Sequence, residues 1–316
     1  MSKGFASTGD TADKKITFEE IGAKLYAFTT EGDPNSGVIV GDDAVMVVDA
    51  QATPVMAQEV IRRVRQVTDK PIKYVLLTHY HAVRVLGASA YSGAEIIASA
   101  QSHALIVERG QQDMDSEIGR FPRLFRAVES IPGLTWPTIT FAGDVSVWLG
   151  KREVRISHLG RAHTAGDVIA WVPDANVVFS GDLVEYQSAC YCGDAHFHDW
   201  PATLDRLAAL KPQALVPGRG AALVSPEKVQ EGIYLTREFL STLYGSVKES
   251  VAKGRTLKET FTAARSVMDP KFSSYAIYEH CMPFNVSRAY DEARGIEWPV
   301  IWTAERDREM WASLQD

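Results

Sequence analysis

Two histidines separated by one residue follow a short apolar run and offer imidazole nitrogens to a metal ion. His79 and His81 come directly after the run 74–77, whose composition is typical of a buried strand. A loop at the end of such a strand can turn both rings toward one point. Zinc takes imidazole nitrogen at about 2.0–2.1 Å, so the pattern fits a zinc site. Two loop histidines that bind no metal would show the same sequence pattern. Further donor residues elsewhere in the sequence are needed to distinguish a metal site from this alternative.

Further polar residues stand at the ends of other predicted strands. His163 lies in a turn between two strands, and Asp182 closes the apolar run 177–180. A glycine turn, 216–220, follows the last predicted strand. Loops carried by a rigid scaffold are where binding and catalytic residues concentrate. We therefore expect these loops to meet the His79 loop at one edge of the fold and to form a site there.

Short strands with helices outside them must position these loops. Apolar or alternating runs predict strands at 24–29, 37–40, 44–49, 74–78 and 96–98 in the first half of the chain, and at 138–141, 145–149, 153–158, 168–172, 177–180 and 214–216 in the second. Helices are predicted at 54–67, 100–110 and 201–210. Two strand-rich halves with external helices predict an α/β fold, a four-layer αββα sandwich.

Three segments are expected along the chain. Residues 1–15 are polar and predict a mobile tail, and residues 16–224 hold the strands of the sandwich. After Ser225 and Pro226 the pattern becomes helical. We therefore expect 225–316 to form a helical C-terminal extension, either a small domain or a lid.

At these positions the sequence resembles the metallo-β-lactamase-fold superfamily of hydrolases, which includes glyoxalase II and lactonases. The resemblance runs from about residue 20 to 224 and implies the αββα fold. It also implies that Asp182 is the bridging aspartate and that Asp49 is the aspartate at the end of an early strand. The implied ligands of the first metal are His79, His81 and His163.

Three positions depart from the family pattern, and all belong to its second metal site. Val83 and Arg84 stand where the resemblance implies the aspartate and last histidine of a His-x-His-x-Asp-His loop, and Arg219 stands where it implies a histidine of the last glycine turn. Valine has no donor atom, and arginine stays protonated. We therefore expect one metal per chain rather than two.

The two arginines keep the vacated site positive. A missing divalent ion and a missing aspartate together remove one net positive charge, whereas Arg84 and Arg219 supply two. Guanidinium groups bind carboxylates in a bidentate manner, so both could orient an anionic or carbonyl-bearing substrate or stabilise an oxyanion. They could equally pair with Asp182 and fill the space. The sequence leaves both interpretations open.

The predicted function is hydrolysis with a single zinc-bound hydroxide. Three histidines on zinc lower the pKa of a bound water to about 7, and the hydroxide could attack an ester, lactone, thioester or amide carbonyl while Asp182 orients or deprotonates the water. Two alternatives stay open. Two of the histidines with one carboxylate could hold non-haem iron, as in persulfide dioxygenases of this fold, or a catalytically silent protein could bind an anion through its arginines.

Five further residues are candidates for supporting the site or contacting substrate. Asp49 ends a buried strand, where it can hold the His79 loop or orient a ligand histidine. The other four belong to later segments that could reach the pocket or only pack: Tyr186, His196, His198 and His280. The segment 275–285 could cap the site and select a substrate with an apolar part, or it could join the extension to the sandwich.

Composition and charge exclude several classes of partner. The 316 residues carry a net charge of -7, which argues against nonspecific binding to nucleic acid or to an anionic membrane. No apolar run approaches the roughly 20 residues of a membrane span. From the polar N-terminus we expect no signal peptide, and the odd number of cysteines, 3, favours a reducing compartment, so a cytoplasmic location is expected. The expected partner is a small molecule, and the aromatic-rich tail is compatible with a homodimer.

Overall fold

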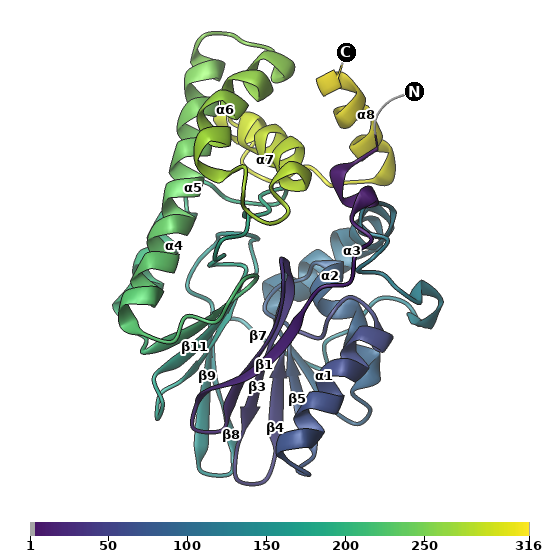
Figure 1. Ribbon diagram of the computed structural model, residues 1–316, viewed down its shortest axis with the longest axis vertical. Coiled ribbons are helices and arrows are strands. Elements are labelled where there is room, and N and C mark those ends of the chain that lie inside the picture. The colour runs from purple at the N-terminus through teal and green to yellow at the C-terminus, as the bar shows by residue number, and fades with distance from the viewer. Residues whose placement is uncertain (1–3, 316) are drawn as a thin grey trace.

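Alternating apolar strands form two β-sheets that stack face to face, with helices on the outer faces (Figure 1). The computed structural model describes residues 4–315. The two sheets, their flanking helices and the helices that follow them form the αββα sandwich with a helical C-terminal extension that the sequence predicts.

The first sheet contains seven strands among the described residues, in the order β1 to β7. They are β1 (Ile16–Gly22), β2 (Leu25–Thr30), β3 (Asp33–Val40), β4 (Val45–Val48), β5 (Ile72–Leu76), β6 (Glu95–Ser99) and β7 (Ile139–Phe141). β1 to β4 form an antiparallel meander, whereas β4 to β7 are parallel. Parallel strands end at the same edge of a sheet, where ligands usually bind. Asp49, after β4, and His79, after β5, therefore come to one edge.

The second sheet has the order β12, β11, β10, β9, β8. Its strands are β8 (Asp144–Leu149), β9 (Arg152–Ser157), β10 (Ile169–Val172), β11 (Val177–Gly181) and β12 (Ala214–Pro217). All pairs are antiparallel except β11 and β12, which are parallel. Asp182 follows β11 directly, and the turn that holds His163 joins β9 to β10.

One predicted strand belongs to the other half of the fold. The sequence analysis assigns 138–141 to the second half, but β7 pairs in parallel with β6, with Ile139 opposite Ile97. The Thr138 amide also donates to the carbonyl of Ile96 at 2.8 Å. The long helix between β6 and β7 provides the crossover that a parallel pair requires, so this strand ends the first sheet.

Eight α-helices and three short 3-10 helices complete the described chain. The α-helices are α1 (Pro54–Val67), α2 (Ala82–Val85), α3 (Ala100–Arg120), α4 (Trp200–Ala209), α5 (Pro226–Ala252), α6 (Leu257–Phe272), α7 (Tyr278–Ala293) and α8 (Ala304–Gln315). The 3-10 helices are η1 (Ala6–Gly9), η2 (Leu86–Ala90) and η3 (Val128–Ser130). α1 has the predicted bounds because the Thr53 hydroxyl accepts the Met56 amide and Pro54 occupies the first turn, where its missing N–H costs nothing. Within residues 4–315, no helix combines the length and apolarity that crossing a membrane requires.

Strand periodicity divides the apolar residues between the layers. Val38 and Val40 of β3 pack with α1, whereas Ile39 between them packs with residues of the second sheet. Successive strand side chains point to opposite faces, so one strand contributes to both the inner and the outer core. Helices α4 to α8 and the outer face of the second sheet share a third apolar cluster.

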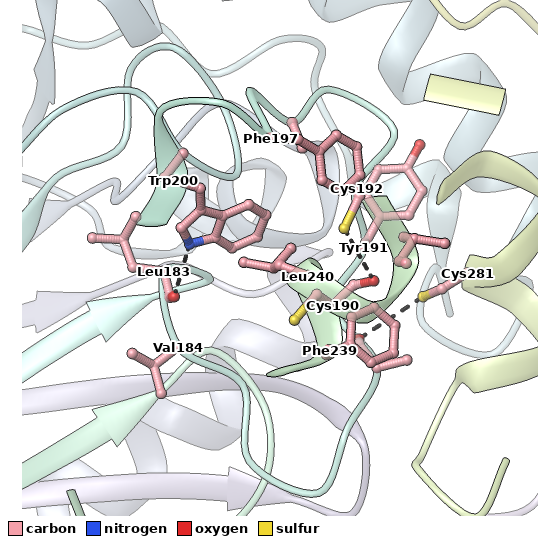
Figure 2. Close-up of a cluster of buried hydrophobic side chains, with 14 of the residues drawn as sticks. Leu183, Val184, Cys190, Tyr191, Cys192, Phe197, Trp200, Phe239, Leu240 and Cys281 are labelled. Carbon is pink, nitrogen blue, oxygen red and sulfur yellow. Dashed lines mark hydrogen bonds between the residues drawn. The ribbon is translucent and has the colours of Figure 1, made fainter. Parts of the chain in front are cut away.

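The loop between β11 and α4 is buried against the C-terminal helices (Figure 2). The indole nitrogen of Trp200 donates to the carbonyl of Leu183 at 3.1 Å. The Cys281 thiol of α7 lies 3.9 Å from the carbonyl of Ala189. Three free cysteines are buried in this region: Cys190, Cys192 and Cys281. The extension therefore supports a loop that begins at Asp182, while the domain boundary near residue 225 stays a prediction.

The N-terminal segment packs on the C-terminal helices over part of the predicted tail. Residues 1–3 of that tail lie outside the described residues. The Phe5 ring stacks on Trp311 at 5.6 Å between centroids, and Ser7 is buried. The sequence analysis did not anticipate this packing, because the aromatic partners of Phe5 lie more than 250 positions away in the sequence.

Candidate metal centre

Two loops bring three histidines together at the edge where the two sheets meet. His79 and His81 come from the loop after β5, and His163 comes from the turn between β9 and β10. One nitrogen of each ring lies within 4.8 Å of the others. All three side chains are buried. This is the grouping that the strand-end pattern predicts.

Each ring is held from behind through its other nitrogen. His79 Nδ1 is 3.0 Å from the Thr78 hydroxyl, and His163 Nδ1 is 2.8 Å from the carbonyl of Tyr191. His81 Nε2 is 3.0 Å from a carboxylate oxygen of Asp194. Such hydrogen bonds to the remote nitrogen fix the orientation and tautomer of metal-binding histidines. The three rings thus present their remaining nitrogens to a common point.

The nitrogens that face this point fit a metal ion. His79 Nε2 is buried and has no hydrogen-bond partner among residues 4–315, although buried polar atoms are nearly always paired. His81 Nδ1 and His163 Nε2 lie 2.9 Å apart. Asp182 Oδ2 lies 3.9 Å from His79 Nε2 and 3.6 Å from His163 Nε2. Three imidazole nitrogens and one carboxylate oxygen form a donor set that zinc commonly uses.

Burial keeps two of the imidazoles neutral, as metal ligation requires. It lowers the pKa of His163 to about 3 and that of His79 well below its ordinary value, against the opposing effect of Asp182. Burial also lowers the pKa of His81, but Asp113 and Asp194 outweigh it and raise the pKa to about 9. Ligation through His81 would therefore release a proton.

Asp49 holds the loop rather than facing the ligand nitrogens. Its two carboxylate oxygens accept the amide and the hydroxyl of Thr78, each at 2.9 Å. The same hydroxyl lies beside His79. Asp49 therefore reaches His79 through Thr78, which is the geometry of an orienting residue.

Asp182 carries two arginines in addition to its place beside the histidines. Arg84 donates to one of its carboxylate oxygens, and Arg219 Nη1 donates to the other at 3.1 Å. Burial raises the pKa of Asp182, but Arg84, His79 and Arg219 together hold it well below the usual range. Gly218 leaves room for this arrangement, because a Cβ there would lie 2.3 Å from the Asp182 carboxylate.

Arg84 is almost inaccessible, and both of its terminal nitrogens donate to buried acceptors. It also donates to the carbonyl oxygens of Asn35 and Gly218 at 2.9 and 2.8 Å, and its side chain is 1% exposed. Val83 beside it packs into the apolar core between the first sheet and its helices. Of the two interpretations that the sequence leaves open, the pairing of Arg84 with Asp182 is the one seen in these contacts.

Four carboxylates near the centre carry no site role in the sequence analysis. Asp194 accepts from His81 and from Arg109, and Glu185 accepts from Arg219 at 3.1 Å. Asp113 and Glu117 accept the amides of Ala82 and Val83 at the start of α2. Their side chains come from α3 and from the loop after β11. Local sequence patterns carry no signal for such contacts between distant segments.

The remaining candidates lie at three separate places. Tyr186 donates its hydroxyl to Glu231 at 3.1 Å on α5. His196 and His198 line a cleft with Glu292 and Glu297, outside the histidine group. His280 lines a different cavity, which it shares with Arg219. Their roles stay predictions.

The sequence of this chain is similar to the metallo-beta-lactamase superfamily over residues 29–219. It is 22% identical over 278 residues to the linear primary-alkylsulfatase of Pseudomonas sp., covering 76% of this chain and 51% of that protein. The chain thus spans about half the length of the alkylsulfatase. It is 25% identical over 209 residues to the metallo-beta-lactamase IND-1 of Chryseobacterium indologenes, covering 64% of this chain and 75% of that protein.

Solved structures share the fold. A metallo-beta-lactamase from Pontibacter korlensis superposes with a TM-score of 0.58 at 20% identity and covers 72% of this chain and 99% of its own. The lactamase FIM-1 from Pseudomonas aeruginosa, solved in a mono-zinc form, superposes with a TM-score of 0.56 at 20% identity and covers 72% and 96%. The family match extends over more than half of the residues and includes every candidate metal ligand. This chain therefore belongs to the metallo-beta-lactamase superfamily.

Proposed function

We propose that the protein is a metal-dependent hydrolase that uses one zinc ion on His79, His81 and His163, with Asp182 beside them. The observation that carries this proposal is the buried Nε2 atom of His79, which has no partner among the described residues. Every other ring nitrogen of the three histidines is within hydrogen-bond distance of a neighbour. Leaving a buried polar atom unpaired costs about 1–3 kcal/mol, and a bound ion would remove that cost.

A single ion is proposed because Arg84 already supplies the second cation. Its guanidinium lies on Asp182, the residue that would bridge two metals in the resemblance. Three acceptors surround this guanidinium, so displacing it would leave a charged group without partners in a buried place. Such a loss costs about 3–5 kcal/mol, which disfavours entry of a second ion.

When bound, zinc on three imidazoles lowers the pKa of water to about 7 and supplies a nucleophile at neutral pH. Asp182 stays ionised and accepts hydrogen bonds, so it can orient the attacking water. Arg219 stands beside it with a permanent positive charge, which can hold an anionic group or stabilise an oxyanion. Thr78 and Asp194 keep the rings of His79 and His81 in place.

The proposed substrate is a small molecule with an ester, lactone, thioester or amide carbonyl. The alkylsulfatase likeness adds sulfate esters to this range, because that relative is named for such substrates and matches 76% of this chain. An anionic group in the substrate would suit the arginine beside the centre.

Elemental analysis of the purified protein tests the proposal. We expect one zinc ion per chain, loss of hydrolysis after chelation and its return with zinc, measured on a panel of an aryl ester, a thioester, a lactone and an alkyl sulfate. Absence of bound metal together with hydrolysis that resists chelation would contradict it. Iron with oxygen consumption in the presence of a persulfide would support the dioxygenase alternative, and anion binding without turnover would support the silent one.

A further inference from the structure

A cavity of about 230 Å³ lies beside the candidate metal centre. Its lining comes from residues 6–10, from 32–33, from the segment 121–124 that follows α3 and from 273–280, and Arg219 is shared by the cavity and the centre. The segments 6–10 and 273–280 lie outside the family match at 29–219. The volume is below the roughly 300–1,000 Å³ of drug-sized sites, so the cavity suits a small ligand.

The carboxylates around this cavity are already paired with basic side chains, and Asp10 is paired with Lys14 at 2.9 Å as well as with Arg123. Asp33 accepts two hydrogen bonds from Arg123 at 2.5 Å each, and Asp10 accepts one from the same guanidinium at 3.2 Å. Glu279 accepts two from Arg265, at 2.6 and 2.8 Å. An approaching anion would therefore meet little repulsion from these three side chains.

Arg219 lines the cavity and has donors that no carboxylate occupies. Its Nη1 donates to Asp182 and Glu185, each at 3.1 Å. Among residues 4–315, the Nη2 and Nε atoms of Arg219 have no hydrogen-bond acceptor. Neither atom is fully enclosed by protein. A guanidinium with two adjacent free N–H groups is suited to a planar or tetrahedral anion.

The other walls are apolar or uncharged. Phe121, Leu124 and Ile277 supply carbon surface. Ser7 and His280 are hydrogen-bonded to one another at 2.7 Å, and burial together with nearby arginines lowers the pKa of His280 well below its ordinary value. The cavity thus combines an apolar wall with charged side chains, and among these Arg219 also contacts the candidate metal centre.

The backbone of this wall is strained. Ile277 has φ 54°, and a β-branched side chain in the left-handed region is a genuine outlier. Strain of this kind, about 1–3 kcal/mol per residue, is concentrated at ligand clamps and active sites. A glycine at this position would relieve most of the strain, because it has no Cβ.

We propose that this cavity is the substrate pocket and that it takes a monoanion with a short apolar body, the anionic group on Arg219 and the body against Phe121, Leu124 and Ile277. This inference rests on the proposed function, since it names the substrate class of the same centre. It also assigns substrate selection to the N-terminal segment and to 273–280, which lie outside the family match.

Isothermal titration of the metal-free and the zinc-loaded protein tests the pocket. Hexane-1-sulfonate and hexanoate are the probes, because neither can be hydrolysed, and hexan-1-ol is the neutral match. We expect both anions to bind each form of the protein at least ten times more tightly than the alcohol. Binding by the alcohol as tight as by the anions would overturn the proposal.

Two variants locate the binding. Arg219→Gln should weaken the binding of hexane-1-sulfonate at least tenfold. Ile277→Glu should weaken it as much, because the new carboxylate repels the anion while the buried ion pairs stay intact. Val267→Glu, at an exposed position of α6, is the matched control and should bind normally. Unchanged binding in Ile277→Glu would overturn the proposal. If the protein binds metal and hydrolyses a substrate but neither anion competes, the pocket proposal is wrong and the hydrolase proposal stands. If the anions bind but the protein holds no metal, the hydrolase proposal is wrong and only the anion-binding pocket stands.

Discussion

The histidine half and the arginine half of the centre are held by opposite kinds of contact. In the histidine half, each ring is hydrogen-bonded from behind and turns its second nitrogen to a shared point, where His79 Nε2 has no partner among the described residues. In the arginine half, Asp182 accepts from a different guanidinium on each of its oxygens. The histidine half presents nitrogen donors to a shared point, whereas the arginine half is closed by ion pairs.

Under the proposal of a single zinc ion, this difference shows how a two-metal scaffold could work with one metal. Arg84 would supply a covalently attached cation in place of the second ion, and metal chemistry would be confined to the histidines. Changes in the first half should therefore alter metal binding, and changes in the second half should alter folding.

Replacing His79 should have the largest effect on the histidine half. We expect His79→Ala to lower zinc content from one ion to below about 0.1 ion per chain, with hydrolysis falling by more than the 10–100-fold typical of residues that only support a ligand. The metal-free protein should also lose some stability, because the buried ring packs against those of His81 and His163, so zinc content is the deciding measurement. His103→Ala on α3 is the control. Full zinc content in His79→Ala would refute the assignment.

Asp182→Asn should have the largest effect on the arginine half, and on stability rather than on metal alone. The change leaves Arg84 and Arg219 without their shared carboxylate in a buried place, at an expected cost of about 3–5 kcal/mol. Chemical denaturation of the metal-free protein measures it. Asp205→Asn removes the exposed ion pair between Asp205 and Arg237, whose nitrogen and oxygen lie 2.6 Å apart. This control should lower the free energy of unfolding by less than about 1 kcal/mol. Equal costs for the two variants would contradict the contrast.

Asp194→Asn should weaken the histidine half without dismantling it. The amide side chain can still lie beside His81. It does not favour the tautomer of His81 that carries its proton on Nε2 and leaves Nδ1 unprotonated for a metal ion. Removal of such an orienting carboxylate typically costs about 10–100-fold in metal affinity, which competition with a chelator measures. Asp199→Asn, on the same loop and paired with Arg161, is the matched control. An unchanged zinc affinity would show that Asp194 does not act through His81.

Local signals were enough to predict the scaffold and the three histidines. α1 follows from a capping threonine, a first-turn proline and the spacing of its apolar face. The grouping of His79 with His163 follows from strands that end at one edge. Each of these inferences needs only a short stretch of sequence and one rule about how strands or helices begin and end.

The supporting carboxylates could not be predicted in this way. Asp194 and Glu185 lie in a loop without regular structure, and contacts with the C-terminal helices set its path. The side chain of Asn285 on α7, for example, binds the backbone of Cys190 and Cys192, each bond being 2.7 Å long. Ser7 reaches His280 across 273 positions. Such pairings depend on the packed tertiary structure and leave no periodic trace in the sequence.

The smallest expected effect concerns Glu185, which joins the arginine half to the substrate pocket proposed above. Burial, helped by Asp182 and opposed by Arg219, raises its pKa from 4.5 to about 8. Between these values the folded chain keeps a proton that the unfolded chain has released, so this group's contribution to stability declines as pH rises through that window. It is fully present below about pH 4.5 and is lost above about pH 8.

Glu185→Gln removes this titration while keeping an acceptor for Arg219. The melting temperature of the metal-free protein should therefore drop less between pH 5.5 and 8 in the variant than in the unmodified chain, by at least about 2 °C. Differential scanning calorimetry at both values gives the difference, and Asp205→Asn, which alters an exposed carboxylate, gives the background. Parallel changes in the variant and the unmodified chain would mean that Glu185 is ionised beside Arg219, and the arginine half would then be fully neutralised by its own carboxylates.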